Sequence, residues 1–400
     1  MKKQRNIPKL RFPEFKGEWK KRKLGELSII NPTTGKLPEK FIYIDLESVI
    51  NGDLTKEVLI DKNAAPSRAQ RVLEKDDILF QMVRPYQKNN LYFDKSGDYV
   101  ASTGYAQIKT KQNSRFIYQY LHLQKFVDEV IERCTGTSYP AINSKDLAKI
   151  SIRYPSLPEQ KKIASFFTAI DQKISQLKRK KTLLEQYKKG VMQKIFSQEI
   201  RFKDDNGQEF PKWEKKKLSE ISDRRTAKNN EGNENVLTIS AQYGLVSQLD
   251  FFNKSVAAND LSGYYLLRKD DFVYNRSYSA GYPMGAFKRL KLYDRGVVST
   301  LYICFTFNSD TNLSFIEQYF ESGRHNREIE RIAQEGARNH GLLNIGVGDF
   351  FNTEILLPSL PEQTKIANFL SAIDNKISQT QKQIEKAEVW KKGLMQQMFV

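Results

Sequence analysis

The chain contains very little cysteine and histidine. Its 400 residues include two cysteines, Cys134 and Cys304, and three histidines, His122, His325 and His340. Two cysteines cannot build a disulfide framework or a cysteine zinc site. None of the histidines has neighbours at a spacing suited to a metal site or a catalytic triad. We therefore expect no metal ligands and a location in a reducing compartment, the cytoplasm.

Long apolar segments are also missing. No run of about 18 apolar residues occurs, so we expect no membrane span. The start of the chain, Met1 to Arg5, is basic, but prolines at 8 and 13 follow it where a signal peptide would have an apolar stretch. We expect no signal peptide.

Recognisable catalytic motifs are absent as well. No glycine-rich loop ends in Gly-Lys-Ser or Gly-Lys-Thr, which argues against ATP hydrolysis on this chain. A metal-dependent nuclease needs Pro-Asp followed by Glu-x-Lys, yet none of the 13 prolines precedes an aspartate. The segment 31–34, Asn-Pro-Thr-Thr, lacks the aromatic residue that an amino-methyltransferase loop would use. The sequence predicts no catalytic residues and a protein that is not itself an enzyme.

Basic residues exceed acidic ones, and they do so unevenly. The chain has 65 Lys and Arg against 47 Asp and Glu, a formal charge of +18. Residues 1–196 carry +17 of this charge and residues 197–400 carry +1. Such an excess indicates a polyanionic partner, most often nucleic acid and sometimes an anionic membrane. We expect the first half to make most of the phosphate contacts.

An internal repeat organises the whole chain. Residues 155–176 and 358–379 are identical at 17 of 22 positions, at an offset of 203 that continues without a gap to the end of each block. Each copy follows a block that is much less similar between the halves. We therefore divide the chain into a first variable domain, 1–157, a first helix, 158–196, a second variable domain, 197–360, and a second helix, 361–400.

The two variable blocks predict one shared α+β fold. Short runs rich in β-branched and aromatic residues, at 41–45, 77–81, 272–274 and 297–305, are typical of strands. Segments 116–132 and 313–333 are each expected to form a single amphipathic helix. Lys75-Asp76-Asp77-Ile78 matches Lys269-Asp270-Asp271-Phe272. The fold class is thus two similar mixed α/β domains, each followed by a long helix.

The repeated blocks carry a sustained 3.5-residue apolar period, which is typical of coiled coils. We expect the two helices to pair with each other. Two alternatives are that each stripe packs on its own preceding domain, or on a second copy of the chain. Lys181 and Lys188 interrupt the stripe. The predicted seam consists of Ile163, Phe167, Ile170, Ile174, Leu177, Leu184, Ile366, Leu370, Ile373, Ile377, Ile384 and Leu394.

Two pairs of polar segments are candidates for reading DNA bases, because Arg, Lys, Asn and Gln can make paired hydrogen bonds to base edges. One pair follows the matched Lys-Asp-Asp strands, and the other comes just before the chain returns to its helix. The alternative is that they are ordinary polar loops, and Arg84 and Arg276 could instead hold phosphates. The candidates are Arg84, Tyr86, Gln87, Lys88, Asn89, Asn90, Ser138 and Tyr139 in the first domain, and Asn275, Arg276, Tyr278, Arg338, Asn339 and His340 in the second.

The repeated Pro-Ser-Leu-Pro-Glu-Gln-x-Lys-Ile-Ala block and the Ala-Ile-Asp-x-Lys-Ile helix that follows it resemble the specificity subunits of Type I restriction-modification enzymes. The resemblance covers essentially the whole chain. It implies that each variable block is a target recognition domain that reads one half of a split, asymmetric DNA sequence. It also implies that the two helices form an antiparallel coiled coil that spaces these domains and docks other subunits.

The same resemblance assigns cofactors and partners. No cofactor is expected on this chain. S-adenosylmethionine belongs to modification subunits, two of them, while ATP and Mg belong to restriction and translocase subunits. One alternative is the recognition subunit of a restriction enzyme with a single-polypeptide partner. Another is a non-catalytic coiled-coil scaffold, or a basic protein that binds anionic surfaces, without sequence-specific DNA recognition.

Overall fold

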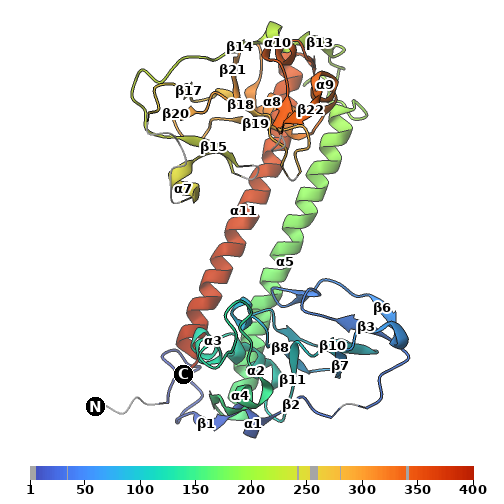
Figure 1. Cartoon of the computed structure of the whole chain (residues 1–400), viewed down its shortest axis with the longest axis vertical. Coiled ribbons are helices and arrows are strands. Elements are labelled where there is room, and N and C mark those ends of the chain that lie inside the picture. Colours follow the sequence, from blue (N-terminus) through green and yellow to red (C-terminus); the bar gives the residue numbers. More distant parts are fainter. Residues whose placement is uncertain (1–5, 34, 241–242, 253–259, 280, 339–341) are drawn as a thin grey trace. The chain divides into compact units, whose positions relative to one another are not determined.

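The computed structural model describes residues 6–33, 35–240, 243–252, 260–279, 281–338 and 342–400 (Figure 1). The chain forms two compact units. Unit 1 comprises Met1–Arg179 and Gln381–Val400, and unit 2 comprises Lys180–Thr380. Each unit therefore contains one variable block, the first part of the long helix that follows it, and the last part of the other long helix. The division at 157, 196 and 360 stays a prediction.

Two long helices follow the variable blocks. Helix α5 spans Leu157–Phe196 and helix α11 spans Leu360–Met398. Each has proline in its second position, where no backbone N–H is needed, and a glutamate in its first turn, where the helix dipole favours negative charge. In each unit the two helices run antiparallel, because Asp171 contacts Lys391 and Lys178 contacts Glu388 in unit 1, and residues near 190 pack with residues near 370 in unit 2.

The variable domain of unit 1 contains two four-stranded sheets, with strand orders β2-β11-β8-β9 and β6-β3-β10-β7. Strands β3 and β10 pair in parallel, and the other pairs in these sheets are antiparallel. Strand β1 pairs with β12, next to the start of α5. The strands are β1 (Lys20–Lys23), β2 (Ser28–Ile30), β3 (Lys40–Ile44), β4 (Val49–Ile50), β5 (Asp53–Leu54), β6 (Leu59–Asp61), β7 (Ala69–Val72), β8 (Ile78–Gln81), β9 (Leu91–Tyr92), β10 (Tyr99–Ser102), β11 (Tyr105–Thr110) and β12 (Ser151–Tyr154). The helices are α1 (Leu24–Leu27), α2 (Ser114–Leu121), α3 (Gln124–Ile131) and α4 (Ser144–Lys149), with short 3₁₀ turns η1 (Lys62–Ala64) and η2 (Pro85–Gln87).

Unit 2 repeats one of these sheets, in the order β14-β21-β18-β19, and β13 pairs with β24 as β1 does with β12. Helices α8 and α10 pack on this sheet, where Phe320 stacks on Phe287 and Phe350 contacts Phe305 (Figure 1). The strands are β13 (Glu214–Lys217), β14 (Ser222–Arg224), β15 (Leu237–Ser240), β16 (Gly244–Ser247), β17 (Tyr265–Arg268), β18 (Phe272–Asn275), β19 (Ala286–Arg289), β20 (Arg295–Val298), β21 (Ile303–Phe307), β22 (Gln334–Arg338), β23 (Leu342–Asn344) and β24 (Glu354–Leu357). The helices are α6 (Leu218–Ile221), α7 (Gln248–Phe252), α8 (Leu313–Glu321), α9 (Asn326–Ile332) and α10 (Val347–Phe351).

Three segments that were each predicted to form one continuous element form two elements in the structure. The segment 116–132 is two helices, α2 and α3, because the backbone of Leu123 is extended. The segment 313–333 is also two helices, and Gly323 adopts a left-handed conformation, with φ of 72°, between them. The run 297–305 is two strands, β20 and β21, separated by residues 299–302. Hydrophobic content alone does not reveal these breaks.

The apolar seam of each helix faces two partners at once. In unit 1, Ile163, Phe167, Ile170 and Ile174 belong to a core that includes Phe116 of the variable domain and Met395, Met398 and Phe399 at the end of the chain. In unit 2, Ile366, Leu370 and Ile373 pack in the same way with Phe315 and with Met192, Ile195 and Phe196 of α5. Leu177 and Ile384 are buried, whereas Leu184, Ile377 and Leu394 are half-buried. Packing on the preceding domain and pairing with the other helix therefore occur together.

Polar contacts repeat between the units. In unit 1 the Asp171 carboxylate accepts a hydrogen bond from Gln119 Nε2 at 2.7 Å and lies 2.6 Å from Lys391 Nζ. In unit 2 Asp374 accepts from Gln318 Nε2 at 2.8 Å and lies 2.7 Å from Lys188 Nζ. Each aspartate thus joins a helix of the variable domain to both long helices, and Lys188 interrupts the apolar stripe because it makes this contact.

Candidate nucleic-acid interface

The matched Lys-Asp-Asp segments form a turn that starts the central strand of each domain. Asp76 and Asp270 have left-handed backbones, with φ of 72° and 77°. Asp77 Oδ2 accepts a hydrogen bond from Glu74 N at 2.8 Å, and Asp271 Oδ2 accepts one from Arg268 N at 2.8 Å. Burial raises the pKa of both Asp77 and Asp271. The motif is therefore structural, and it aligns the two domains at an offset of 194.

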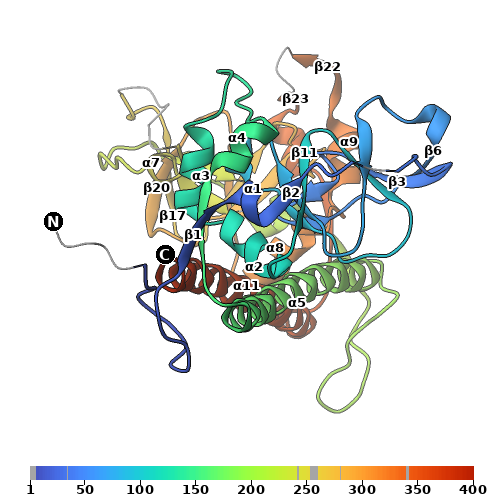
Figure 2. The same ribbon diagram turned by 90° about the horizontal axis from the view of Figure 1, so that it is seen from below.

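In unit 1 the two candidate segments form one surface, which we call surface 1: residues 82–90 after β8 and residues 134–142 between α3 and α4. Arg84 N donates to Pro140 O at 2.8 Å, and Ile142 N donates to Met82 O at 3.1 Å. Figure 2 shows the loop between α3 and α4 projecting away from α5. The two segments, which begin 52 residues apart in the sequence, are thus held together by backbone hydrogen bonds.

Arg84 is the cation at the centre of surface 1. Its backbone is left-handed, with φ of 53°, a conformation that costs a non-glycine residue about 1 to 2 kcal/mol. Its guanidinium carbon lies 4.2 Å from the centre of the Tyr139 ring, which is a cation–π contact. Its Nε is buried without a hydrogen-bond partner among the described residues. Tyr139 and Tyr86 are 65% and 49% exposed, and Ser138 is exposed beside them.

Other candidates of this surface are engaged inside the domain. Asn90 is 1% exposed and its Oδ1 accepts from Gln81 N at 2.9 Å. Gln87 Oε1 accepts from Gln81 Nε2 at 2.8 Å, and Asn89 Oδ1 accepts from the backbone of Asn51. Lys88 Nζ donates to Gln124 Oε1 and to a backbone carbonyl, and partial burial lowers the pKa of Lys88. These side chains shape the loop, and the buried Gln81 that braces it has no signature in the sequence.

Unit 2 contains the equivalent surface, surface 2, made of residues after β18 and of the β22–β23 hairpin. Leu343 N donates to Arg276 O at 3.0 Å, as Ile142 N does to Met82 O. Tyr278 is 65% exposed. Figure 2 shows the hairpin on the side of unit 2 away from α11. Arg338 ends β22, while Asn339 and His340 lie outside the described residues.

Arg276 differs from Arg84 in its bonding. Its Nη2 donates to Leu301 O at 2.9 Å and its Nη1 donates to Ile345 O at 3.2 Å, so the guanidinium ties three segments of unit 2 together. The neighbouring Asn275 Oδ1 accepts from Ser277 N at 3.0 Å. At the offset of 194, Arg276 corresponds to Met82, and Arg84 corresponds to Tyr278. The two arginines that the sequence suggests as counterparts are not equivalent.

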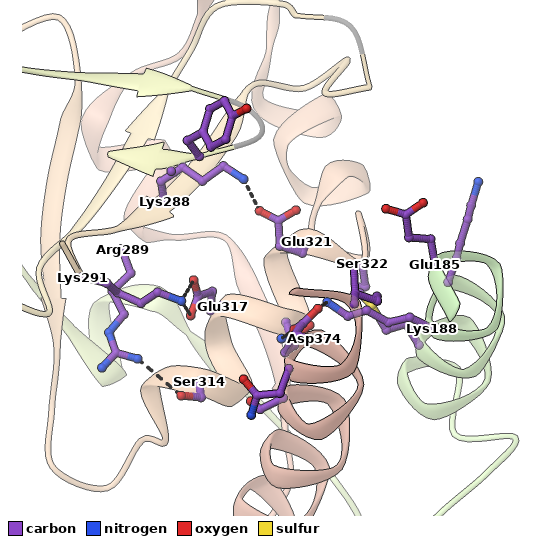
Figure 3. Close-up of a pocket in the computed structure, with 18 of the residues that line it drawn as sticks. Glu185, Lys188, Lys288, Arg289, Lys291, Ser314, Glu317, Glu321, Ser322 and Asp374 are labelled. Carbon is purple, nitrogen blue, oxygen red and sulfur yellow. Dashed lines mark hydrogen bonds and ion pairs between the residues drawn. The ribbon is translucent and has the colours of Figure 1, made fainter. Parts of the chain in front are cut away.

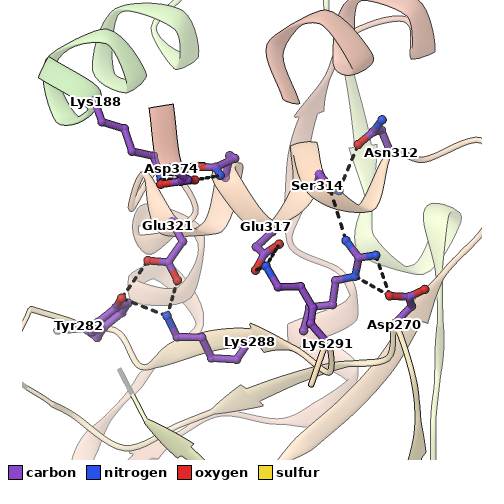
Figure 4. Close-up of polar contacts among 12 residues, drawn as sticks. Lys188, Asp270, Tyr282, Lys288, Lys291, Asn312, Ser314, Glu317, Glu321 and Asp374 are labelled. Atoms are coloured by element: carbon purple, nitrogen blue, oxygen red, sulfur yellow. Dashed lines mark hydrogen bonds and ion pairs between the residues drawn. The ribbon is translucent and has the colours of Figure 1, made fainter. Parts of the chain in front are cut away.

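A polar cleft of about 780 Å³ lies in unit 2 beside helix α8 (Figure 3). Its charged side chains are largely paired: Lys291 Nζ donates to Glu317 Oε1 at 2.8 Å, and Lys288 contacts Glu321. Tyr282 Oη also donates to Glu321, as Figure 4 shows. Arg289 donates to Asp270 Oδ1. An equivalent cleft of about 920 Å³ in unit 1 is lined by Asp171 and Lys391, among others. Because these charges are paired with each other, the clefts are structural in character, and surfaces 1 and 2 remain the candidates for contact with DNA.

The described residues offer little for other chemistry. No cluster of three or more His, Cys, Asp or Glu side chains among them could hold a metal ion. His325 is buried, and its pKa is lowered to about 3 by that burial. Within the part of the chain that the structure describes, no helix combines the length and apolar character needed to cross a bilayer.

Comparison with protein families decides the identity. The family model for the Type I restriction modification DNA specificity domain matches residues 16–186 and again residues 211–389. The chain belongs to the Type I restriction-modification specificity subunits. As such it is the non-catalytic subunit that directs the complex to its target sites, and the family lacks catalytic cofactor sites.

One relative matches nearly the full length of the chain, and another matches less than half of it. The chain is 24% identical over 412 residues to the Type I restriction enzyme MjaVIII specificity subunit of Methanocaldococcus jannaschii, covering 96% of this chain and 92% of the relative. It is 24% identical over 188 residues to the HindI specificity subunit of Haemophilus influenzae, which covers 45% of this chain and 41% of that one.

Solved structures show the same fold. The crystal structure of a Type I restriction-modification S subunit from M. genitalium aligns with a TM-score of 0.58 at 14% identity, over 98% of this chain and 99% of that one. A chain from a structure of the assembly and conformational transition of a type I restriction-modification system aligns with a TM-score of 0.55 at 19% identity, over 94% and 96%. The specificity subunit thus has the predicted fold class, with two mixed α/β domains and two long helices packed together.

Proposed function

We propose that this specificity subunit recognises a bipartite, asymmetric DNA sequence, with surface 1 reading one half and surface 2 the other. The observation that carries the proposal is the repeat itself. In each unit the same two segments are joined by a backbone hydrogen bond, Ile142 N to Met82 O and Leu343 N to Arg276 O, above the same sheet. The side chains of these segments differ, with the half-buried Arg84 in one unit where the exposed Tyr278 stands in the other. Two domains with the same fold but different side chains at these positions suit a DNA target whose two halves differ in sequence.

The uneven charge suggests that the two halves of the chain contribute differently to DNA binding. Residues 1–196 carry +17 and residues 197–400 carry +1. Phosphate contacts supply most of the affinity that does not depend on sequence. The first half therefore holds the DNA more strongly, while both surfaces contribute to the choice of sequence.

Exchange of one domain tests the proposal. Residues 20–145 are replaced by the matching block of a relative, and the DNA bound by the assembled methyltransferase is identified by selection from a random duplex library. One half-site changes, while the other half-site and the spacer are retained. The matched control is exchange of residues 214–348, which changes the opposite half-site. If either exchange altered both half-sites together, the two-module assignment would be wrong.

The partners follow from the same duplication. Trp390 in unit 1 and Tyr187 in unit 2 occupy equivalent positions on the long helices and are 55% and 54% exposed. Two equivalent aromatic sites suit two copies of one partner, the modification subunit, which brings S-adenosylmethionine. Restriction and translocase subunits bring ATP and Mg to the larger complex, whose place of action is the cytoplasm. The mass of the assembled methyltransferase, measured under native conditions, tests the ratio of two modification subunits to one specificity subunit.

Two alternatives give different measurements. A scaffold, or a basic protein that binds anionic surfaces, would bind random and selected duplexes equally, whereas the proposed reader prefers its target by at least about 10³-fold. A restriction enzyme with a single-polypeptide partner would assemble without separate modification subunits.

A further inference from the structure

We infer that Arg84 reads a guanine in the first half of the target, and that Arg276 reads no base. The inference rests on the proposed function, in which surface 1 faces DNA, and it names the base that this surface selects. Guanine is the base whose major-groove edge offers two neighbouring acceptors, N7 and O6, to the paired donors of one arginine.

The guanidinium groups of Arg84 and Arg276 differ in their hydrogen bonds. Among the described residues, the two terminal nitrogens of Arg84 have no hydrogen-bond partner, and its buried Nε has none either. Both terminal nitrogens of Arg276 donate to backbone carbonyls, at 2.9 and 3.2 Å. Arg84 therefore has two free, parallel donors for a ligand. Arg276, whose Nε likewise has no partner among the described residues, already uses one N–H of each terminal nitrogen to bind the fold.

Arg84 is also held in place before DNA arrives. Its amide N–H donates to Pro140 O at 2.8 Å, and the residue after it is the buried Pro85. Its guanidinium lies 4.2 Å from the ring centre of Tyr139. A flat ring under a flat guanidinium restricts the plane in which the donors point, so less side-chain freedom is lost when both bonds form.

The alignment of the two domains at the offset of 194 also separates Arg84 from Arg276. The position of Arg84 is occupied in unit 2 by Tyr278, and the position of Arg276 is occupied in unit 1 by Met82. Met82 and Arg276 both accept a backbone hydrogen bond from the neighbouring segment, so this position joins the two segments in each domain. The position of Arg84 and Tyr278 changes in chemistry, as a reading position should, whereas at the position of Met82 and Arg276 the backbone hydrogen bond is common to both units.

The test uses the specificity subunit assembled with its modification subunits. Wild type, Arg84→Ala and Arg84→Lys are each given a duplex library randomised in both half-sites. Wild type selects guanine at one position of the first half-site. Both variants lose that preference by about 5- to 150-fold, the discrimination that a bidentate pair provides, and keep their preference in the second half-site. Lysine fails because it cannot make the paired, planar contact.

A change in the DNA gives the same information without a change in the protein. Replacing that guanine by 7-deazaguanine removes the N7 acceptor and leaves Watson–Crick pairing intact. Wild type binds this duplex about 10-fold more weakly, and Arg84→Ala binds it no more weakly than the unmodified one, because the two changes remove the same interaction.

Arg276→Ala is the matched control. It lowers the midpoint of thermal unfolding and leaves the base preference of each half-site unchanged in the fraction that remains folded. The inference is overturned if Arg84→Ala weakens binding equally to every duplex and reduces the salt slope by about one, the signature of a phosphate contact. It is also overturned if wild type tolerates 7-deazaguanine throughout the first half-site. If wild type selects no bipartite sequence at all, the proposed function fails instead.

Discussion

The ion pair between Arg11 and Glu159 gives the sharpest prediction about stability. Arg11 Nε and Nη2 each lie 2.7 Å from an oxygen of Glu159, in a bidentate contact that ties the segment before the first domain to the start of α5. The side chains are 13% and 1% exposed. Arg11→Met therefore leaves a buried carboxylate whose remaining side-chain donor, within the part of the chain that the structure describes, is Trp19 Nε1 at 3.4 Å. Breaking a buried pair in this way costs about 3 kcal/mol.

Urea and thermal unfolding measure this cost. For a unit of this size we expect a fall of about 10 °C in the unfolding midpoint of unit 1. The double variant Arg11→Met, Glu159→Gln removes the buried charge as well and should recover most of the loss. Arg22→Met is the control, since Arg22 and Glu26 form a 4.0 Å pair that is 64% and 47% exposed, and its loss costs at most about 0.5 kcal/mol. If Arg11→Met unfolds like wild type, or if the double variant is no more stable than the single one, the buried pair does not hold this junction.

Two further predictions concern the cores of the units. Ile174→Asp places a charge among Met395, Phe399 and their neighbours in the core of unit 1, where Ile174 is 7% exposed, and should lower the free energy of unfolding by about 3 kcal/mol in urea titrations. His325 has a pKa of about 3 in the folded chain, below its ordinary value of 6.5. The stability that unit 2 gains from keeping this histidine neutral is therefore fully present above pH 6.5 and falls as the pH drops from there toward 3. The variant His325→Gln cannot take up this proton. Below pH 6, its free energy of unfolding should therefore change with pH less steeply than that of wild type, by about 1.4 kcal/mol per pH unit. Equal slopes would show that His325 is not the titrating group.

The architecture could be predicted because the sequence states it twice. A 3.5-residue apolar period over residues 163–195 and an offset of 203 identify two long helices and two related domains. The helix breaks at Leu123 and Gly323 could not be predicted in the same way, because the apolar pattern continues across both. The seam of each helix also contacts its own domain and the other helix together, and a one-dimensional pattern does not distinguish these partners.

The candidate interface was predictable as segments but not as side chains. The sequence places two polar segments per domain at equivalent points, and backbone hydrogen bonds join them in both units. Which side chains face outward depends on contacts that composition does not reveal, such as the bond from Gln81 N to the buried Asn90. The likeness of Arg84 and Arg276 in the sequence is misleading, since one has free donors and the other braces the fold.

Comparison of the two copies of the repeat also helps to distinguish residues that hold the fold together from residues that select DNA bases. Three polar residues of the repeated helical block that are identical in both copies have a partner inside each unit. Glutamate binds the arginine of the preceding segment, glutamine accepts from the N-cap asparagine of the variable domain, and aspartate binds the lysine of the other helix. These pairs are Glu159 with Arg11, Glu362 with Arg201, Gln160 with Asn113, Gln363 with Asn312, Asp171 with Lys391, and Asp374 with Lys188.

Because the scaffold accounts for these identical polar residues, they have no need of a second role in DNA recognition. If the two half-sites differ in sequence, at least some of the residues that select bases must differ from their counterparts. Positions on surfaces 1 and 2 that differ between the copies, and whose side chains are free to contact DNA, are therefore where we expect specificity to reside. Tyr278 is 65% exposed, and the half-buried Arg84 has terminal nitrogens without a partner among the described residues. Arg276 is also half-buried, but both of its terminal nitrogens donate to backbone carbonyls.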